Sequence, residues 1–250
     1  DIDFLAVSGH KLFAPGSPGV LIVRRELLGS GLFGDVGGGT VDRVYADGRV
    51  VYSPVLEARE EAGTPNVPGT LGLGLVAKIL LEQGMISIRE HDLALTELLL
   101  RELRKRDWIE VYGGDSPGGL SRVGTVSFNL IDVPHGLVGT ALSDRYSIWV
   151  RTHCFCAHPY VQRFLERGRP VATASFEGGE LARQGMVRAS FGPWNDRSDI
   201  DRLMGALDEI QRVGVSGLGY TPHRDGTWEP VGSELPSCFS IDSLYRTTKR

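Results

Sequence analysis

Short apolar runs bounded by turn-forming residues open the chain. Phe4–Val7 is predicted to be a buried strand, and Gly19–Arg24 is predicted to be a second apolar strand. Val41–Tyr45 and Arg49–Tyr52 flank an Ala-Asp-Gly segment, and Asp-Gly between two such runs is typical of a β-hairpin. The first part of the chain is therefore expected to contain several short strands.

Helical periodicity follows. Small and apolar residues from Gly69 to Gln83 predict an apolar helix that Gly84 ends, and Ile86 to about Arg106 has the spacing of an amphipathic helix. Ser198 or Asn195 is the expected N-cap of the last predicted helix. The remaining predicted elements are strands at Ile109–Tyr112, Gly124–Leu130, Ile148–Arg151 and Met186–Ser190, and helices near Leu137–Asp144, Tyr160–Arg167 and Asp199–Val213.

This order of elements predicts an α/β first part and an α+β second part. We expect two domains, residues 1–85 and 86–213, and a loosely ordered tail over 214–250 that is rich in Gly, Pro, Ser and Thr. The first strand has almost nothing before it, whereas a parallel strand needs neighbours supplied by crossover units. We therefore expect that an N-terminal half is missing from this chain; a chain shortened only by processing is the alternative.

Composition excludes some partners. The 27 Lys and Arg against 31 Asp and Glu give a net charge of −4, which provides no basic field for nucleic acid. The longest apolar runs, such as Leu98–Leu100, are far shorter than the ~20 residues of a membrane helix. Three cysteines, an odd number, argue against a disulfide framework and for a reducing compartment. We expect a cytoplasmic protein with neither nucleic acid nor a membrane as partner.

One group of chemically active residues follows the first strand. Lys11 lies in a turn rich in Gly and Pro, with Ser8 and His10 beside it, where α/β folds place their ligands. A partly desolvated lysine can form an imine with an aldehyde, and the hydroxyl and imidazole can donate hydrogen bonds to a phosphate. An exposed turn lysine without a function is the plain alternative from these residues alone.

A second group combines an arginine, two histidines and two thiols. It runs from Arg151 through Cys154 and Cys156 to His158. The Cys-x-Cys spacing is not that of usual structural zinc sites, so no metal is expected. Positive neighbours lower the pKa of a thiol, which favours a nucleophilic cysteine, although buried structural cysteines remain the alternative. On an extended segment the two thiols would face the same side.

A third candidate is Arg188, inside the otherwise apolar strand Met186–Ser190. An inward-pointing arginine needs an anionic partner. That partner is either an internal carboxylate or the carboxylate of a substrate.

Five motifs occur in a distinctive order and spacing: Ser8-Gly9-His10-Lys11, Gly19-Val20-Leu21, Glu61 through Asn66, Val150 through Pro159, and Arg188-Ala189-Ser190. Together they resemble the class V aminotransferases, and within them the cysteine desulfurase and selenocysteine lyase branch, from residue 1 to about 213. The resemblance implies the C-terminal portion of the large domain of a fold-type I transferase that depends on pyridoxal 5′-phosphate (PLP), followed by a small α+β domain.

The resemblance also implies how the cofactor is held. Lys11 would attach PLP covalently and later move protons on the substrate, while Ser8 and His10 would bind the cofactor phosphate. Thr64 would reach the phosphate of the partner subunit's cofactor, so the active enzyme would be a homodimer. In this family an aromatic residue that stacks on the cofactor and an aspartate that pairs with its ring nitrogen belong to the N-terminal half, so this chain alone is not expected to hold PLP well.

For the amino-acid substrate, Arg188 would clamp the α-carboxylate and Arg151 would orient the substrate or the cysteine loop. Cys156 falls where desulfurases carry the thiol that becomes a persulfide, and a sulfur-acceptor protein would then be a partner. Many desulfurases have Gly-His-His before this cysteine, whereas this chain has His153-Cys154-Phe155, so Cys154 is a second candidate thiol. The alternatives are a class V aminotransferase or epimerase acting on another amino acid, and a non-catalytic paralogue that keeps only the fold.

Overall fold

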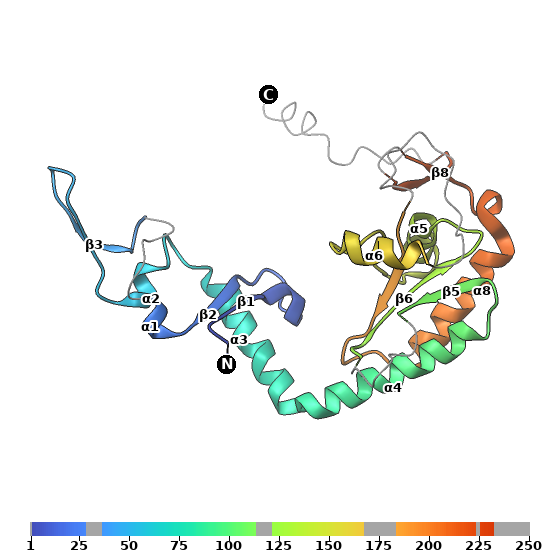
Figure 1. Ribbon diagram of the computed structural model, residues 1–250, viewed down its shortest axis with the longest axis horizontal. Coiled ribbons are helices and arrows are strands. Elements are labelled where there is room, and N and C mark those ends of the chain that lie inside the picture. Colours follow the sequence, from blue (N-terminus) through green and yellow to red (C-terminus); the bar gives the residue numbers. More distant parts are fainter. Residues whose placement is uncertain (1, 29–36, 114–121, 168–183, 224–225, 233–250) are drawn as a thin grey trace, which may run out of the picture. The chain divides into compact units, whose positions relative to one another are not determined.

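The computed structural model describes residues 2–28, 37–113, 122–167, 184–223 and 226–232. The chain divides into two units, Asp1–Met85 and Ile86–Arg250, each of which is described by itself (Figure 1). The predicted tail residues 233–250, Cys238 included, lie outside the described residues.

Unit 1 is built from two antiparallel strand pairs and helices. Strand β1 (Phe4–Ser8) pairs with β2 (Gly19–Val23), and β3 (Val41–Val44) pairs with β4 (Val50–Tyr52), which confirms the predicted hairpin. The helical elements are the 3-10 helix η1 (Gly9–Leu12), α1 (Arg25–Leu28), α2 (Leu56–Arg59) and α3 (Val67–Gln83), which ends before Gly84 as predicted.

The predicted burial of the first strand is wrong for this chain. Phe4 is 59% exposed, Leu21 on the paired strand is 61% exposed, and α3 has no buried residue. The described neighbour of β1 is antiparallel rather than parallel. A two-stranded sheet offers too little surface to bury its apolar side chains, so unit 1 has no apolar cluster of its own among the described residues.

Unit 2 contains a three-stranded antiparallel sheet in the order β5-β6-β7 (Figure 1). Its strands are β5 (Ile109–Tyr112), β6 (Thr125–Leu130) and β7 (Val187–Ser190). Its helices are α4 (Met85–Arg104), α5 (His135–Tyr146), α6 (His158–Leu165) and α8 (Arg197–Leu218). These elements match the predicted ones within a few residues.

The strand predicted at Ile148–Arg151 is wrong. Only Arg151 pairs with the sheet, through an isolated antiparallel bridge to Arg188. The Ser147 backbone is left-handed, with φ 53°, and caps α5. The chain therefore leaves the helix through a tight turn and pairs with β7 only at Arg151.

The main core of unit 2 lies on one face of the sheet. Val126, Phe128 and Leu130 alternate along β6 and are fully buried, as a period of two residues requires when one face is covered. Apolar residues of α4, α5 and α8 pack against them. In the sequence predicted to form a loose tail, β8 (Tyr220–Pro222) pairs with β9 (Trp228–Pro230), and the Trp228 ring joins this core.

The N-terminus of α8 is capped by Asp196, not by Ser198 or Asn195. The Asp196 carboxylate accepts a hydrogen bond from the Ser198 backbone N–H at 2.7 Å, and Asp199 accepts one from the Asp196 N–H. This reciprocal arrangement is a capping box. Asn195 instead holds the preceding turn, where its side-chain oxygen accepts from the Gly192 N–H.

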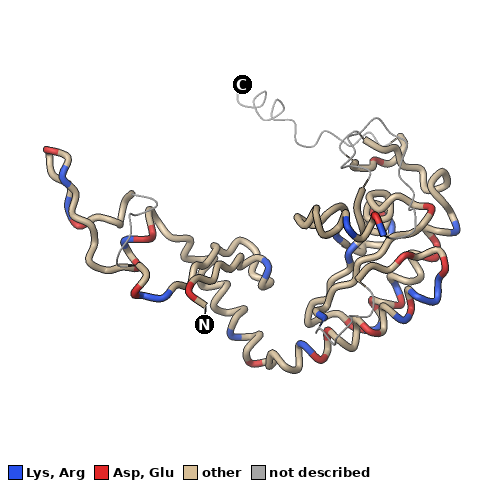
Figure 2. Tube along the Cα trace, in the orientation of Figure 1, with Lys and Arg blue, Asp and Glu red and all other residues tan. Residues whose placement is uncertain are grey.

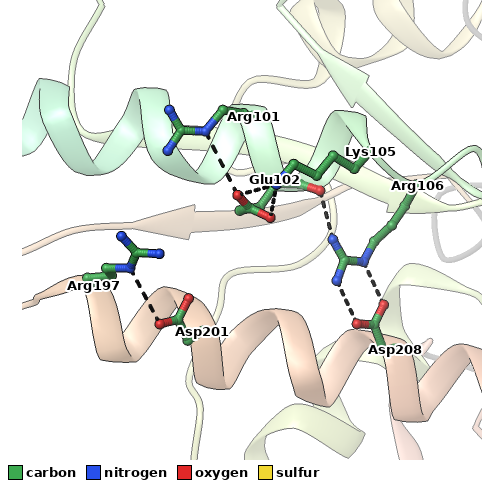
Figure 3. A network of polar contacts seen from close by, with 7 residues as sticks. All are labelled: Arg101, Glu102, Lys105, Arg106, Arg197, Asp201 and Asp208. Carbon is green, nitrogen blue, oxygen red and sulfur yellow. Dashed lines mark hydrogen bonds and ion pairs between the residues drawn. The ribbon is translucent and has the colours of Figure 1, made fainter.

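Residues of both charges alternate with other residues along α4 and α8 (Figure 2), and an ion pair joins the two segments. Arg106, just after α4, donates to both carboxylate oxygens of Asp208 on α8 at 2.6 Å each, and it also donates to the Glu102 carbonyl at 2.8 Å (Figure 3). Within the described residues no single helix has the length and apolarity to span a membrane; α3 and α4 pass that test only as a bent pair.

We expect Arg106→Ala to lower the free energy of unfolding by about 1 kcal/mol, because a bidentate arginine–carboxylate pair is the kind of surface ion pair that contributes measurably. Urea denaturation checks this. The matched control is Arg101→Ala, which removes a more exposed arginine whose Nε lies 3.9 Å from Glu102. Equal effects of the two substitutions would show that the Asp208 pair contributes nothing specific.

Candidate functional site

The lysine turn of unit 1 is closed tightly around a glycine. A Cβ at Gly9 would lie 2.1 Å from the Ser17 Oγ and 2.9 Å from the Pro18 carbonyl oxygen, so no larger residue fits there without a shift of the backbone. Ser17 in turn donates to the Ala14 carbonyl at 2.6 Å. The backbone, rather than a packed core, therefore fixes the direction in which this turn presents its side chains.

The start of α3 is joined to the same turn. The Asn66 side chain caps α3 by accepting from the Gly69 N–H at 3.0 Å, and its amide donates to the Gly16 carbonyl at 2.7 Å. Thr64, two residues before this cap, is exposed. Asn66 therefore connects the lysine turn to the segment that carries Thr64.

The residues of the turn suit a phosphorylated aldehyde such as PLP. Ser8, His10 and Lys11 are all exposed, and they offer an amine for the aldehyde and a hydroxyl and an imidazole for the phosphate. In the described part of unit 1, neither the Lys11 amine nor the His10 ring is engaged by another side chain. The donor set thus fits the cofactor that the sequence predicts.

The cysteine loop of unit 2, His153–Cys156, is a strained turn rather than an extended segment. His153, Phe155 and Cys156 have φ values of 71°, 54° and 62°, in the left-handed region that non-glycine residues rarely adopt. The expectation that both thiols face the same side is therefore wrong. Cys154 is 3% exposed, whereas Cys156 is exposed.

Two arginines are neighbours beside this loop. The Arg151 N–H donates to the Arg188 carbonyl at 3.0 Å and the Arg188 N–H donates to the Arg151 carbonyl at 2.7 Å. Residues paired in this way have their side chains on the same face. Two positive charges opposite each other are unfavourable alone, so the pair favours an anion between or in front of them.

Arg188 also lines a cavity of about 420 Å³. Its Nε is buried and has no hydrogen-bond partner among the described residues, and its guanidinium carbon lies 5.0 Å from the centre of the Phe155 ring. A buried guanidinium N–H without a partner is costly, and a carboxylate supplies the missing acceptor. The other lining residues include Tyr112, Arg122, Thr125, Ser127, Tyr160, Phe164 and Met186.

The sequence did not identify three residues of this region as functional candidates, namely Asn129, Phe155 and His135. Asn129 is buried and donates to the Tyr112 Oη and the Gly185 carbonyl, and its side-chain oxygen accepts from the Val187 N–H. Burial raises the pKa of Tyr112 to about 12. Phe155 and Asn129 carry no sequence signal of their own, since their roles depend on which face of a turn or strand they occupy.

His135 is the third, at the first position of α5. Its ring meets that of His153 edge to face with 4.8 Å between centroids. Burial and, to a lesser degree, His153 lower the pKa of His135 to about 3, so this ring is neutral at ordinary pH. The only available signal was a histidine two residues before the helix predicted near Leu137–Asp144.

The predicted site residues thus fall into two groups. Ser8, His10, Lys11 and the Thr64 segment belong to unit 1, and Arg151, Arg188 and the cysteine loop belong to unit 2. In the described residues no three His, Cys, Asp or Glu side chains gather in a way that would hold a metal ion.

Known proteins that resemble this chain in sequence and those that resemble it in structure belong to one family. The aminotransferase class-V family model matches residues 1–203. A cysteine desulfurase of Serratia proteamaculans is 30% identical over 213 residues, covering 85% of this chain and 47% of the relative. A probable cysteine desulfurase of Staphylococcus epidermidis is 32% identical over 218 residues, covering 84% of this chain and 46% of the relative.

Among solved structures, the cysteine desulfurase CsdA from Escherichia coli matches with a TM-score of 0.68 at 30% identity, covering 86% of this chain and 47% of that one. The fold is therefore that of the fold-type I PLP-dependent enzymes, as the sequence predicts. The chain spans about half the length of the curated relatives that it matches.

We expect the two thiols to differ in reactivity. Burial raises the pKa of the Cys154 thiol, which leaves less thiolate at any given pH, and it also blocks access, so iodoacetamide at pH 8 should modify Cys156 at least ~10-fold faster. Peptide mass spectrometry resolves the sites, and Cys238 is counted separately. Denatured protein is the control, in which the rates should become similar. Faster labelling of Cys154 in the native protein would contradict the observed burial.

His135 should make the protein sensitive to acid. Its pKa is lower folded than unfolded, so unfolding takes up a proton and stability is lost as pH falls below about 6.5. Between pH 7 and 5 the loss from this one group should be about 2 kcal/mol. Urea denaturation at both pH values should show a smaller loss for His135→Phe than for the unsubstituted protein, whereas the exposed control His158→Gln should change little. An unchanged pH dependence in His135→Phe would contradict the assignment.

Proposed function

The chain belongs to the class-V aminotransferase family, and we propose that the protein is a PLP-dependent cysteine desulfurase. It would convert L-cysteine to L-alanine and transfer the sulfur to an enzyme thiol as a persulfide. The observation that carries the proposal is the exposed thiol of Cys156, on a loop whose backbone is paired to the strand of Arg188. The cysteine desulfurases among its relatives support it.

Unit 1 would hold the cofactor. PLP, when bound, supplies an electron sink for the bond cleavage at the amino acid. The Lys11 amine would attach it covalently and, once released, move the proton at the substrate Cα. Ser8 and His10 would donate hydrogen bonds to the phosphate, and the closed backbone around Gly9 would keep these donors in register with the amine.

Unit 2 would bind the amino acid and accept its sulfur. Arg188 would hold the substrate carboxylate through two parallel N–H···O bonds, with Arg151 beside it to favour the negative charge. The Cys156 thiolate would then attack the substrate sulfur. The new S–S bond forms as the Cβ–S bond breaks, its electron pair stays with the carbon fragment, and protonation of that fragment gives L-alanine.

The assembly belongs to the same proposal. Thr64 would contact the phosphate of a cofactor held by the partner subunit of a homodimer. A thiol of a sulfur-acceptor protein would attack the outer sulfur of the Cys156 persulfide and take it over as the S–S bond breaks and the Cys156 thiol is released, which the exposure of Cys156 permits. We propose the cytoplasm as its location, because free thiols persist in a reducing compartment.

The test uses the purified holoenzyme and measures sulfide release from L-cysteine and binding of L-cysteine in the same samples. Cys156→Ser should reduce sulfide release to background yet leave binding intact, because binding precedes the attack by the thiol. Cys154→Ser is the matched control and should keep most of the activity, since its thiol is buried. Lys11→Ala should abolish turnover in either background. A Cys154/Cys156 double variant that releases sulfide at the full rate would overturn the desulfurase proposal and favour the aminotransferase alternative.

A further inference from the structure

The cysteine loop doubles back along the strand that carries Arg188. From Arg151 the chain runs antiparallel to this strand, with two backbone hydrogen bonds to Arg188 and a third, 3.1 Å long, from the Met186 N–H to the His153 carbonyl. The Cys154 thiol then lies 3.7 Å from the Gln184 carbonyl. This part of the loop is therefore fixed to the strand along its length.

The turn reverses the chain directly after Cys154. The Ala157 N–H closes it with a 2.7 Å hydrogen bond to the Cys154 carbonyl, and Phe155 and Cys156 between them both adopt positive φ. The reversal carries the Phe155 ring back to Arg188, where the guanidinium carbon lies 5.0 Å from the ring centre. One side chain of the strained turn thus contacts the arginine, and the next one carries the exposed thiol.

The contact between Phe155 and Arg188 is suited to an arginine that binds a carboxylate ligand. In the described residues Arg188 has no ion pair with an acidic side chain, and its buried Nε has no acceptor. A guanidinium within about 6 Å of a ring centre is stabilised by the ring's negative face. An aromatic face supports the cation without occupying the N–H groups at its edge, which an internal carboxylate would do.

We infer that Phe155 is a positioning residue, which orients the Arg188 guanidinium for a carboxylate ligand and couples it to the position of the Cys156 thiol. The inference rests on the proposed function only in naming that ligand as the carboxylate of an amino acid. Phe155 and Cys156 are successive residues of a turn with little backbone freedom, so a shift of the guanidinium toward a bound carboxylate moves the ring and, with it, the thiol.

Two substitutions at position 155 distinguish the effect of the aromatic ring from that of side-chain volume. Phe155→Leu keeps an apolar side chain but removes the ring, whereas Phe155→Tyr keeps the ring. Phe191→Leu is the matched control, because Phe191 is a partly buried phenylalanine packed against the main core of unit 2 and is not among the residues that line the cavity of Arg188.

Three measurements are made on each variant of the purified holoenzyme: KM and kcat for L-cysteine, the NMR shift of the Arg188 Nε–H, and the rate of Cys156 alkylation with and without L-alanine. Phe155→Leu should raise KM about 5- to 20-fold, the effect of losing a partly desolvated cation–π contact, with a smaller change in kcat. The Nε–H resonance should lose its ring-current displacement, and L-alanine should no longer change the alkylation rate.

Phe155→Tyr should keep all three properties of the unsubstituted protein, and Phe191→Leu should leave them unchanged. A Phe155→Leu protein with unaltered KM and an alkylation rate that still responds to L-alanine would overturn the inference. So would equal effects of Phe191→Leu, which would indicate loss of packing alone. If no variant releases sulfide but the NMR and alkylation results hold, the desulfurase proposal fails while the role of Phe155 stands.

Discussion

The two-residue period of the antiparallel sheet in unit 2 is the constraint on which its core and its site both depend. Val126, Phe128 and Leu130 face the helices and are fully buried. Ser127 and Asn129, between them on β6, face the other side. Because paired residues of neighbouring strands share a face, Arg188, opposite Ser127, is placed on the polar side. One apolar face thus anchors the sheet, and the opposite face is available for chemistry.

That second face has a small apolar cluster of its own. Tyr112, Cys154, Val161 and Met186 are buried together there, with Phe155, Phe164 and Leu165 packed against them. Left-handed backbone at three non-glycine residues costs of order 1–3 kcal/mol each. The burial of Cys154 and the backbone pairing to β7 offset this cost. The backbone pairing to β7 thus anchors the loop, with Cys154 buried and Cys156, two residues later, exposed for reaction.

Unit 1 positions its lysine by other means. Its β1–β2 pair and α3 leave their apolar side chains exposed in the described residues, so packing does little there. Close backbone contacts take that role. The space around Gly9 admits no side chain, and Asn66 joins the cap of α3 to the Gly16 carbonyl. The chemistry proposed for Lys11 therefore depends on a turn whose geometry is local, whereas that of Arg188 depends on a sheet.

The sequence by itself determined what is local or is carried by a motif. Apolar periodicity located α3, α4 and the strands β5 to β7, Asp-Gly placed the β3–β4 hairpin, and five motifs in order identified the family. It could not place side chains whose surroundings come from distant segments. The bridge from Arg151 to Arg188 joins residues far apart in sequence, and the capping preference of Asp196 over its polar neighbours depends on the direction from which the chain enters α8. Only the tertiary structure decided that Cys154 is buried and Cys156 exposed. The chain reverses its direction directly after Cys154, where the loop pairs with β7. No pattern of residue types in the sequence predicts that pairing.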